Sequence, residues 1–269
     1  MRPVILDRFR PTARYLMETE AHVYALAISA SVLLSFYPFL IVMLSFCRNI
    51  LHWPAAVDAI DLALHDYLPG ELSDFVKRNL PTRASVPLSS MFLLLVTANG
   101  VFEPLEVALN RVWGVAKNRS YIRNQMVALG MIFACGGLAL LSLMFTALNQ
   151  RWMADWTHGG LQAWLNQALF KVAAVPLSIL ALFLIYWLLP NRKILPAQVA
   201  PVAILVGMLL EALKYVNLLL WRFLSEKLSR EYGVFHNSVT ILLWSFMASM
   251  IVLAGAEWAA RRAGEDPVS

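Results

Sequence analysis

Charged residues are scarce in this 269-residue chain, at 14% of the sequence, and long stretches lack them altogether. The segment from Val23 to Cys47 contains no Asp, Glu, Lys or Arg. Hydrophobic residues make up 59% of the chain, and the mean hydropathy is +0.63. A helix needs about 20 apolar residues to cross a hydrocarbon core about 30 Å thick, so this composition excludes an ordinary water-soluble domain and indicates a membrane protein.

Cysteines and catalytic motifs are also scarce. The chain has 2 cysteines, Cys47 and Cys135, which show no metal-ligand spacing, so neither a disulfide framework nor a zinc site is expected. The GxSxG, HExxH, Walker and GxGxxG patterns are missing from the sequence. We therefore expect no catalytic residues, no metal and no cofactor, and hence a protein that is not an enzyme.

Six apolar runs predict transmembrane helices, because a backbone in hydrocarbon must satisfy its hydrogen bonds internally. The spans are expected near residues 23–47, 86–109, 126–148, 170–190, 196–221 and 235–259. Pro190 and Pro196 bracket a very short connection, so the fourth and fifth spans should form an antiparallel hairpin. The predicted fold class is an all-α membrane protein, a bundle of about six transmembrane helices that forms a single integral domain over residues 1–269.

The loop after the first span has a helical pattern of its own. Apolar residues recur at helical spacing, at Val57, Ile60, Leu64 and Leu68. Pro69 and Gly70 then turn the chain into residues 71–80. This pattern predicts short amphipathic helices on the outer membrane surface.

The distribution of Lys and Arg predicts the orientation of the spans. Twelve basic residues fall on the side that holds both termini and the 110–125 and 191–195 connections, and nine fall on the other side. Cytoplasmic segments carry the excess of Lys and Arg in membrane proteins, so both termini should be cytoplasmic. The pI of about 9.4 is explained by these loops, and no nucleic-acid partner is expected.

Polar residues in or beside the predicted spans need a physical reason, because a charge inside the bilayer costs at least about 2.5–3.5 kcal/mol. The candidates for an intramembrane polar or substrate path are Glu103, Asn110, Arg111, Glu211, Lys214 and Glu257. Glu211 and Lys214 are three residues apart and share a helix face, so they can neutralise each other. Two interpretations stay open for them: a structural ion pair that holds the helix in the bundle, or part of a polar path. Glu106 is assigned to the headgroup zone.

Basic residues of the predicted cytoplasmic connections are candidate contacts for anionic lipid headgroups: Lys117, Arg119, Arg123, Arg192 and Lys193. A basic residue near an anionic leaflet is worth about 1 kcal/mol. A topology signal explains the same cluster without any binding.

Five short motifs occur in order along the predicted spans. They are Ser35-Phe36-Tyr37-Pro38, Leu109-Asn110-Arg111-Val112-Trp113-Gly114-Val115, Leu189-Pro190-Asn191-Arg192, Glu211-Ala212-Leu213-Lys214-Tyr215, and Tyr232-Gly233 followed by Trp244 and Gly255-Ala256-Glu257. Together, over nearly the whole chain, they resemble the YihY/BrkB family of bacterial inner-membrane proteins. The resemblance implies a six-helix, multi-pass protein of the bacterial inner (cytoplasmic) membrane.

The family has carried the labels of a tRNA ribonuclease and of a serum-resistance factor, and some members look connected with the placement of envelope lipids. A ribonuclease would need carboxylates or histidines around a metal or a general base. The predicted cytoplasmic loops offer basic residues but no acid cluster, so this label fits the chain least well. The resemblance favours transport or handling of lipid or another envelope component, with membrane lipids as partners. The alternative is a non-catalytic anchor or partner of an envelope-assembly complex.

Overall fold

The computed structural model describes residues 4–17, 19–49, 51–54, 56–58, 60, 88–115, 119–156 and 161–265. Every element assigned over these residues is helical, which confirms the all-α prediction. The α-helices are α1 (Val4–Leu16), α2 (Thr19–Asn49), α5 (Leu88–Val112), α6 (Tyr121–Trp156), α7 (Leu161–Leu188), α8 (Pro196–Tyr232) and α9 (His236–Glu265), and a short 3-10 turn, η1 (Gly233–Phe235), joins the last two.

The six predicted spans correspond to α2, α5, α6, α7, α8 and α9, in that order. Several helices run well past the predicted span ends: α8, for example, continues to Tyr232 rather than stopping near residue 221. Its last turns carry Glu226, Lys227 and Arg230, which favour water. Hydropathy marks the part of a helix that suits hydrocarbon, whereas the backbone continues as a helix beyond it.

Within the described residues, three stretches are long and apolar enough to cross a membrane, namely Ile122–Ser142, Pro196–Asn217 and Phe223–Gly264. The number becomes four if the bent pair Arg10–Leu16 and Glu20–Phe36 counts as one span. Pro38–Asn49 and Val175–Leu188 are shorter apolar helices. The chain is therefore an all-α membrane protein.

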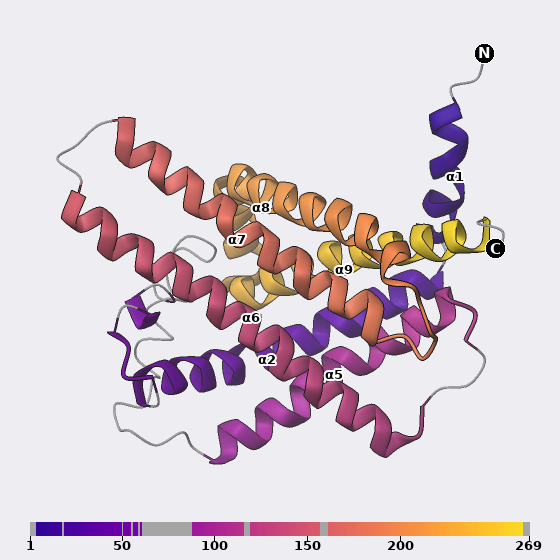
Figure 1. Cartoon of the computed structure of the whole chain (residues 1–269), viewed down its shortest axis with the longest axis horizontal. Coiled ribbons are helices and arrows are strands. Elements are labelled where there is room, and N and C mark those ends of the chain that lie inside the picture. The colour runs from indigo at the N-terminus through magenta and orange to yellow at the C-terminus, as the bar shows by residue number, and fades with distance from the viewer. Residues whose placement is uncertain are drawn as a thin grey trace.

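The six long helices pack in a closed cycle. Helix α2 contacts α5, and the contacts then proceed through α5–α6, α6–α7, α7–α8 and α8–α9 before α9 returns to α2. The short α1 contacts α9 and α2. Both termini lie at one end of the molecule, together with the α5–α6 connection and the α7–α8 turn (Figure 1). Helix α1 runs across this end instead of along the bundle, as Figure 1 shows.

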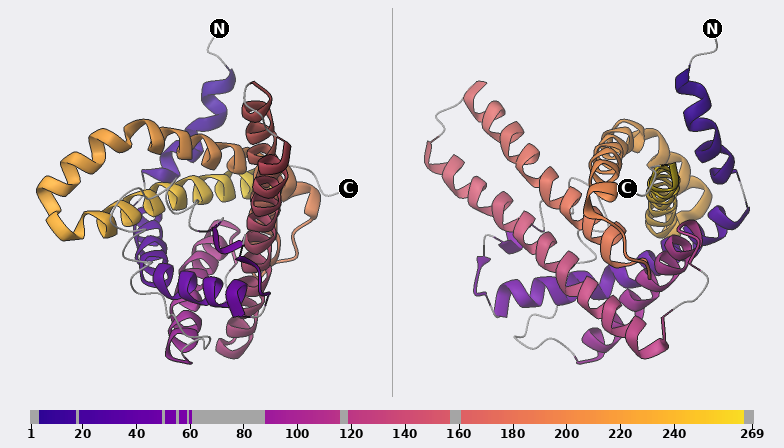
Figure 2. Two further views of the ribbon diagram at one scale, coloured as in Figure 1. Left: turned by 90° about the vertical axis from the view of Figure 1, so that its left-hand side faces the viewer. Right: turned by 45° about the vertical axis from the view of Figure 1, so that its right-hand side comes forward.

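Away from the end that holds the termini, the helices separate. Figure 2 shows that the α6–α7 hairpin and the α8–α9 hairpin point in different directions, so their tips are far apart in both views. The main cluster of buried apolar side chains lies at the tightly packed end that holds both termini, where α5 and α7 finish and α8 begins. It includes Leu109, Trp113, Tyr186, Leu189, Val199, Val202, Val206, Leu253 and Ala256. The packing therefore holds one end of the bundle together.

A smaller cluster lies at the other end of α2, where Leu40, Leu44 and Cys47 pack against Ala56 and Ile60. Of the predicted apolar face, Ile60 is buried and Val57 is half-buried, whereas Asp58 is exposed, as an amphipathic helix requires. Residues 61–87, which hold most of the predicted outer-surface helices, lie outside the described residues.

The close approach of three helices depends on Gly255. A Cβ atom at this position would lie 2.3 Å from Val206 Cγ2 and 2.8 Å from the Tyr186 hydroxyl oxygen. Tyr186 is fully buried and donates a hydrogen bond to the carbonyl oxygen of Val252 at 2.8 Å. Helices α7, α8 and α9 therefore meet at a point where a side chain larger than hydrogen does not fit.

Candidate functional site

The end of α5 presents a buried amide and a buried carboxylate to the neighbouring helices. Glu106 and Asn110 are one turn apart, and both are almost fully buried. Gly114, at φ +66°, ends the helix, and its N–H donates to the carbonyl oxygen of Arg111 at 3.1 Å. A positive φ at this place is the usual glycine ending of a helix, which explains the Trp113-Gly114 sequence.

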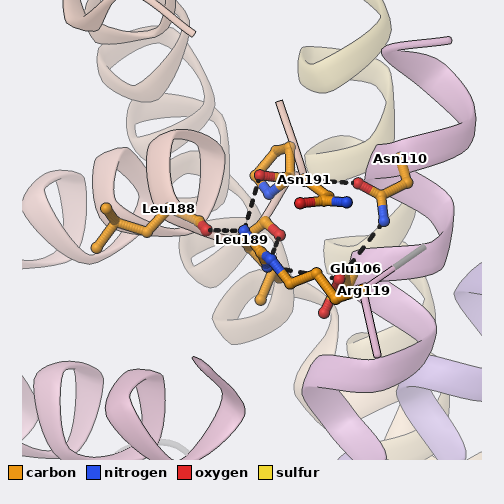
Figure 3. A network of polar contacts seen from close by, with 7 residues as sticks. Glu106, Asn110, Arg119, Leu188, Leu189 and Asn191 are labelled. Carbon is orange, nitrogen blue, oxygen red and sulfur yellow. Dashed lines mark hydrogen bonds and ion pairs between the residues drawn. The ribbon is translucent and has the colours of Figure 1, made fainter. Parts of the chain in front are cut away.

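A cation from the α5–α6 connection meets the buried carboxylate. Arg119 Nη1 lies 3.4 Å from Glu106 Oε1, and the side chains of this pair are only 10% and 4% exposed, respectively. Asn110 Nδ2 lies 3.5 Å from the same Glu106 oxygen, at the limit of a hydrogen bond (Figure 3). A buried carboxylate needs such partners, because an unpaired charge in the interior is very costly.

The same arginine closes the end of α7. Arg119 Nη1 donates to the carbonyl oxygen of Leu189 at 2.8 Å, and Nη2 donates to those of Leu188 and Pro190, each at 3.1 Å (Figure 3). The last carbonyls of a helix have no partner within it and carry partial negative charge, so a cation there is favourable. The planar guanidinium, with its fork of donors, can serve three carbonyls at once.

The α7–α8 turn also donates hydrogen bonds to the end of α5. The backbone N–H of Asn191 donates to Asn110 Oδ1 at 2.7 Å. Arg192 Nη1 donates to the carbonyl oxygen of Trp113 at 2.9 Å, and its guanidinium carbon lies 6.0 Å from the centre of the Trp113 ring. The α5–α6 connection and the α7–α8 turn thus each place an arginine on the other's backbone. We call this set of residues the clasp: Glu106, Asn110, Trp113, Arg119, Asn191 and Arg192.

A second network fastens α1 to α9. The Thr12 hydroxyl donates to Glu257 Oε2, while Arg261 Nε donates to Glu257 Oε1 at 3.2 Å. Arg261 Nη2 also donates to Thr12 Oγ1 at 3.2 Å. Three side chains from both ends of the sequence therefore form one closed ring of hydrogen bonds, which holds α1 across the end of the bundle.

The third polar feature lies far along α8. Lys214 Nζ is 2.5 Å from Glu211 Oε2, and the side chains of Lys214 and Glu211 are 41% and 22% exposed. Both residues belong to the apolar stretch Pro196–Asn217. This ion pair joins two side chains of one helix and is partly exposed, whereas the Glu106–Arg119 pair joins different segments and is buried.

Comparison with known proteins identifies the family. The family model described as "Virulence factor BrkB" matches residues 12–267. The chain belongs to the BrkB family. The clasp therefore consists largely of two of the family-like motifs, the one around Asn110 and the one around Asn191, which bind each other across the bundle.

Several relatives of this BrkB-family chain are named as UPF0761 membrane proteins. A UPF0761 membrane protein of Chlorobium chlorochromatii is 26% identical over 191 residues, which are 71% of this chain and 43% of the relative. Similar proteins of Chlorobium phaeobacteroides and Xanthomonas campestris are 25% and 23% identical, over 74% of this chain and 44% and 47% of their own lengths. The chain thus spans less than half the length of these relatives. No solved structure matches it.

The six predicted path residues of this BrkB-family chain fall into separate places. Asn110 belongs to the clasp, and Glu257 belongs to the network of α1 and α9. Arg111 is exposed and pairs with Glu20 of α2 at 3.3 Å, and Glu103 is exposed on α5. The structure brings Glu211 and Lys214 together as the spacing predicted.

The five residues predicted to contact headgroups also lie in different surroundings. Arg119 is turned inward to the α7 carbonyls, so its guanidinium is engaged within the protein rather than presented to headgroups. Arg192 is exposed but contacts Trp113, and Arg123 and Lys193 are exposed. Lys117 lies outside the described residues.

Sequence reasoning missed the role of Glu106, which it assigned to the headgroup zone. Within the protein, the carboxylate is buried with Arg119 and Asn110, contacts that this assignment did not include. It also missed Thr12, which is buried on α1 against Glu257. The available signal for the clasp was the Asn-Arg dipeptide, which occurs at Asn110-Arg111, Asn118-Arg119 and Asn191-Arg192.

Proposed function

We propose that this protein transports or otherwise handles lipid, or another envelope component, in the bacterial cytoplasmic membrane, with both termini on the cytoplasmic side. The observation that carries the proposal is the partly exposed ion pair of Glu211 and Lys214 within the apolar stretch of α8. Glu211 follows Pro196 by fifteen residues, or about 22 Å along the helix axis. With α8 across the bilayer and Pro196 at one face, this places Glu211 inside a hydrocarbon core about 30 Å thick, nearer to its far side.

The two ion pairs of the bundle differ in kind. Glu106 and Arg119 connect separate segments in a buried place, which is what a structural lock requires. Glu211 and Lys214 are retained in an apolar helix although charges there are costly, and the ion pair between them is local, three residues apart on α8. Ionisable residues inside membrane helices most often mark a substrate or ion pathway. A polar substrate group that must pass the hydrocarbon region explains why this pair is present.

A second candidate function is a non-catalytic anchor or partner for an envelope-assembly complex. The clasp and the ring of Thr12, Glu257 and Arg261 favour it, because they show that this chain uses polar side chains to fix helices to one another. In that case the protein would bind a partner through its surface and move no lipid.

Measuring the exchange of lipid between leaflets distinguishes the two candidate functions. Full-length protein is reconstituted in vesicles that contain a phospholipid with a fluorescent acyl chain, and a membrane-impermeant quencher then reports the lipid that reaches the outer leaflet. We expect faster exchange than in protein-free vesicles and in vesicles that hold an unrelated helical membrane protein at equal density. Exchange equal to both controls would reject lipid movement and favour the anchor.

A further inference from the structure

We propose that a phospholipid with a zwitterionic headgroup, which carries one phosphate and one primary ammonium, binds beside Glu211 and Lys214 at the place where α7 and α8 diverge. This inference rests on the proposed function and adds to it a binding place and a class of headgroup.

Helix α8 approaches α7 closely at Gly207. A Cβ atom there would lie 2.6 Å from Ile179 Cγ1 and 3.6 Å from Leu182 Cδ1, both on α7. Beyond this contact the hairpin of α6 and α7 and the hairpin of α8 and α9 run apart (Figure 2). The face of α8 that is covered by α7 at Gly207 is therefore less covered further along the helix.

The ion pair lies on that face. Glu211 and Lys214 follow Gly207 by four and seven residues, and helical residues at these spacings lie on the same side. The partial exposure of both side chains agrees with the departure of α7 from this face. A molecule in the membrane can therefore reach the pair from the side of the bundle, between the two diverging hairpins.

The charges of the pair match a zwitterionic headgroup. A lysine ammonium binds phosphate as a point charge, and a glutamate carboxylate accepts hydrogen bonds from a primary ammonium. An ammonium has three donor hydrogens and a carboxylate has two acceptor oxygens, so a pair of this kind can bind a phosphate on one side and an ammonium on the other. An anionic headgroup without an ammonium would place only repulsive charge near Glu211.

Apolar residues beside the pair suit the acyl chains of the same lipid. Met208, Tyr215 and Leu219 are exposed on neighbouring positions of α8. They offer apolar surface above and below the two charges, so a lipid can keep its chains in the hydrocarbon region while its headgroup contacts the pair. The site thus combines charged groups for a headgroup with apolar surface for acyl chains.

Native mass spectrometry of the delipidated full-length protein tests this site. The protein is titrated with phosphatidylethanolamine or with phosphatidylglycerol that has identical acyl chains. We expect the wild type to retain phosphatidylethanolamine more strongly than phosphatidylglycerol. In Glu211→Gln the ratio of the two affinities should fall roughly tenfold, because one charge-assisted hydrogen bond is lost. Lys214→Met should weaken the retention of both lipids, because both carry a phosphate.

A matched control lies on the same helix. Glu226 forms an ion pair with Arg230 at 3.5 Å, and its side chain is 75% exposed. Glu226→Gln removes the same charge outside the proposed site and should leave the preference unchanged. If a single variant folds poorly, Glu211→Gln/Lys214→Gln removes both charges and leaves no uncompensated one, and it should also lose the preference.

Two failures remain distinguishable. Equal retention of the two lipids by the wild type, or an unchanged preference in Glu211→Gln and in the double variant, would overturn the site even if the wild type accelerates lipid exchange. A wild type that fails to accelerate exchange in vesicles would overturn the proposed function itself, whatever lipid the protein retains.

Discussion

The Arg119 guanidinium donates to the carbonyl oxygen of Leu189 at 2.8 Å, so that a side chain from the connection between α5 and α6 closes the C-terminal end of α7. The same guanidinium neutralises the buried carboxylate of Glu106. One arginine thus serves two helices that are far apart in the sequence. The clasp holds the end of the bundle where both termini lie, while the hairpins at the other end diverge (Figures 1 and 2).

The clasp should depend on guanidinium geometry and not merely on positive charge. Arg119→Lys keeps the charge, but an ammonium cannot serve the carbonyls of Leu188, Leu189 and Pro190 together. We expect the free energy of unfolding in detergent to fall by about 1.5–3 kcal/mol, the size of a hydrogen bond to a charged group. Denaturant unfolding followed by tryptophan fluorescence measures this change. The exposed Arg123, changed to Lys, provides the control and should stay within about 0.5 kcal/mol of the wild type.

Coupling between Glu106 and Arg119 gives a separate test of the clasp. Arg119→Met leaves the Glu106 carboxylate buried without its cation and should cost about 3–5 kcal/mol. Adding Glu106→Gln should recover part of this loss, because the uncompensated charge disappears. Additive losses in a double-mutant cycle would show that the two residues do not act as a pair.

Gly255 should tolerate no side chain. In Gly255→Ala the new methyl group would collide with Val206 and with the Tyr186 hydroxyl, so we expect a loss of about 1–3 kcal/mol in the free energy of unfolding. At Gly130 of α6, a Cβ atom would meet no atom within 4 Å among the described residues outside the local backbone of its own helix, and Gly130→Ala should leave stability unchanged or raise it by about 0.5–1 kcal/mol. Equal effects of the two changes would contradict the close approach of α7, α8 and α9.

Thr12 should control how firmly α1 is held. Thr12→Val keeps the size and branching of the side chain but removes its bonds to Glu257 and Arg261. Hydrogen exchange monitored by mass spectrometry should show faster exchange of the α1 amides, with little change in α8. Ala13→Val, at the exposed neighbouring position, introduces the same β-branched residue and should not have this effect. Unchanged protection of α1 in Thr12→Val would mean that other contacts hold the helix.

The sequence predicts the helices well because hydropathy reflects a local property. Each expected span lies on a helix, and the two prolines around residues 191–195 correctly mark the turn between α7 and α8. Helix ends are predicted less well, since α6 and α8 extend beyond the apolar residues that identify them. The spacing of Glu211 and Lys214 also predicts their pairing, because i,i+3 contacts require no tertiary information.

The clasp could not be predicted in this way. Arg119 and Leu189 are seventy residues apart, and the cluster of basic residues around Arg119 suggests a surface when it is considered in isolation. The fold brings the α5–α6 connection against the end of α7, and this turns the arginine inward. The burial of Glu106 could not be predicted for the same reason. A carboxylate near the end of a span is expected to face water, and only the structure shows the buried cation beside it.

The orientation of the chain in the membrane is a prediction that labelling can check. Single cysteines are introduced at Ser120 and at Val234, which are both exposed and lie on the α5–α6 connection and at the tip of the α8–α9 hairpin. The native Cys47 and Cys135 are replaced by alanine in this background. An impermeant maleimide added to spheroplasts, whose inner membrane is intact, should label the cysteine at 234 and spare the one at 120. The reverse pattern would place both termini outside the cytoplasm.

The most direct measurement compares lipid exchange and stability in one variant, Glu211→Gln/Lys214→Gln, reconstituted in vesicles and unfolded in detergent beside the wild type. We predict that exchange falls at least roughly tenfold, equivalent to about 1.4 kcal/mol in the barrier, because the polar contact for the headgroup is gone. The free energy of unfolding should change by less than about 1 kcal/mol, since both charges are removed together and no uncompensated charge is left in the bundle. Exchange at the wild-type rate in the folded variant would contradict the role of this pair in lipid handling.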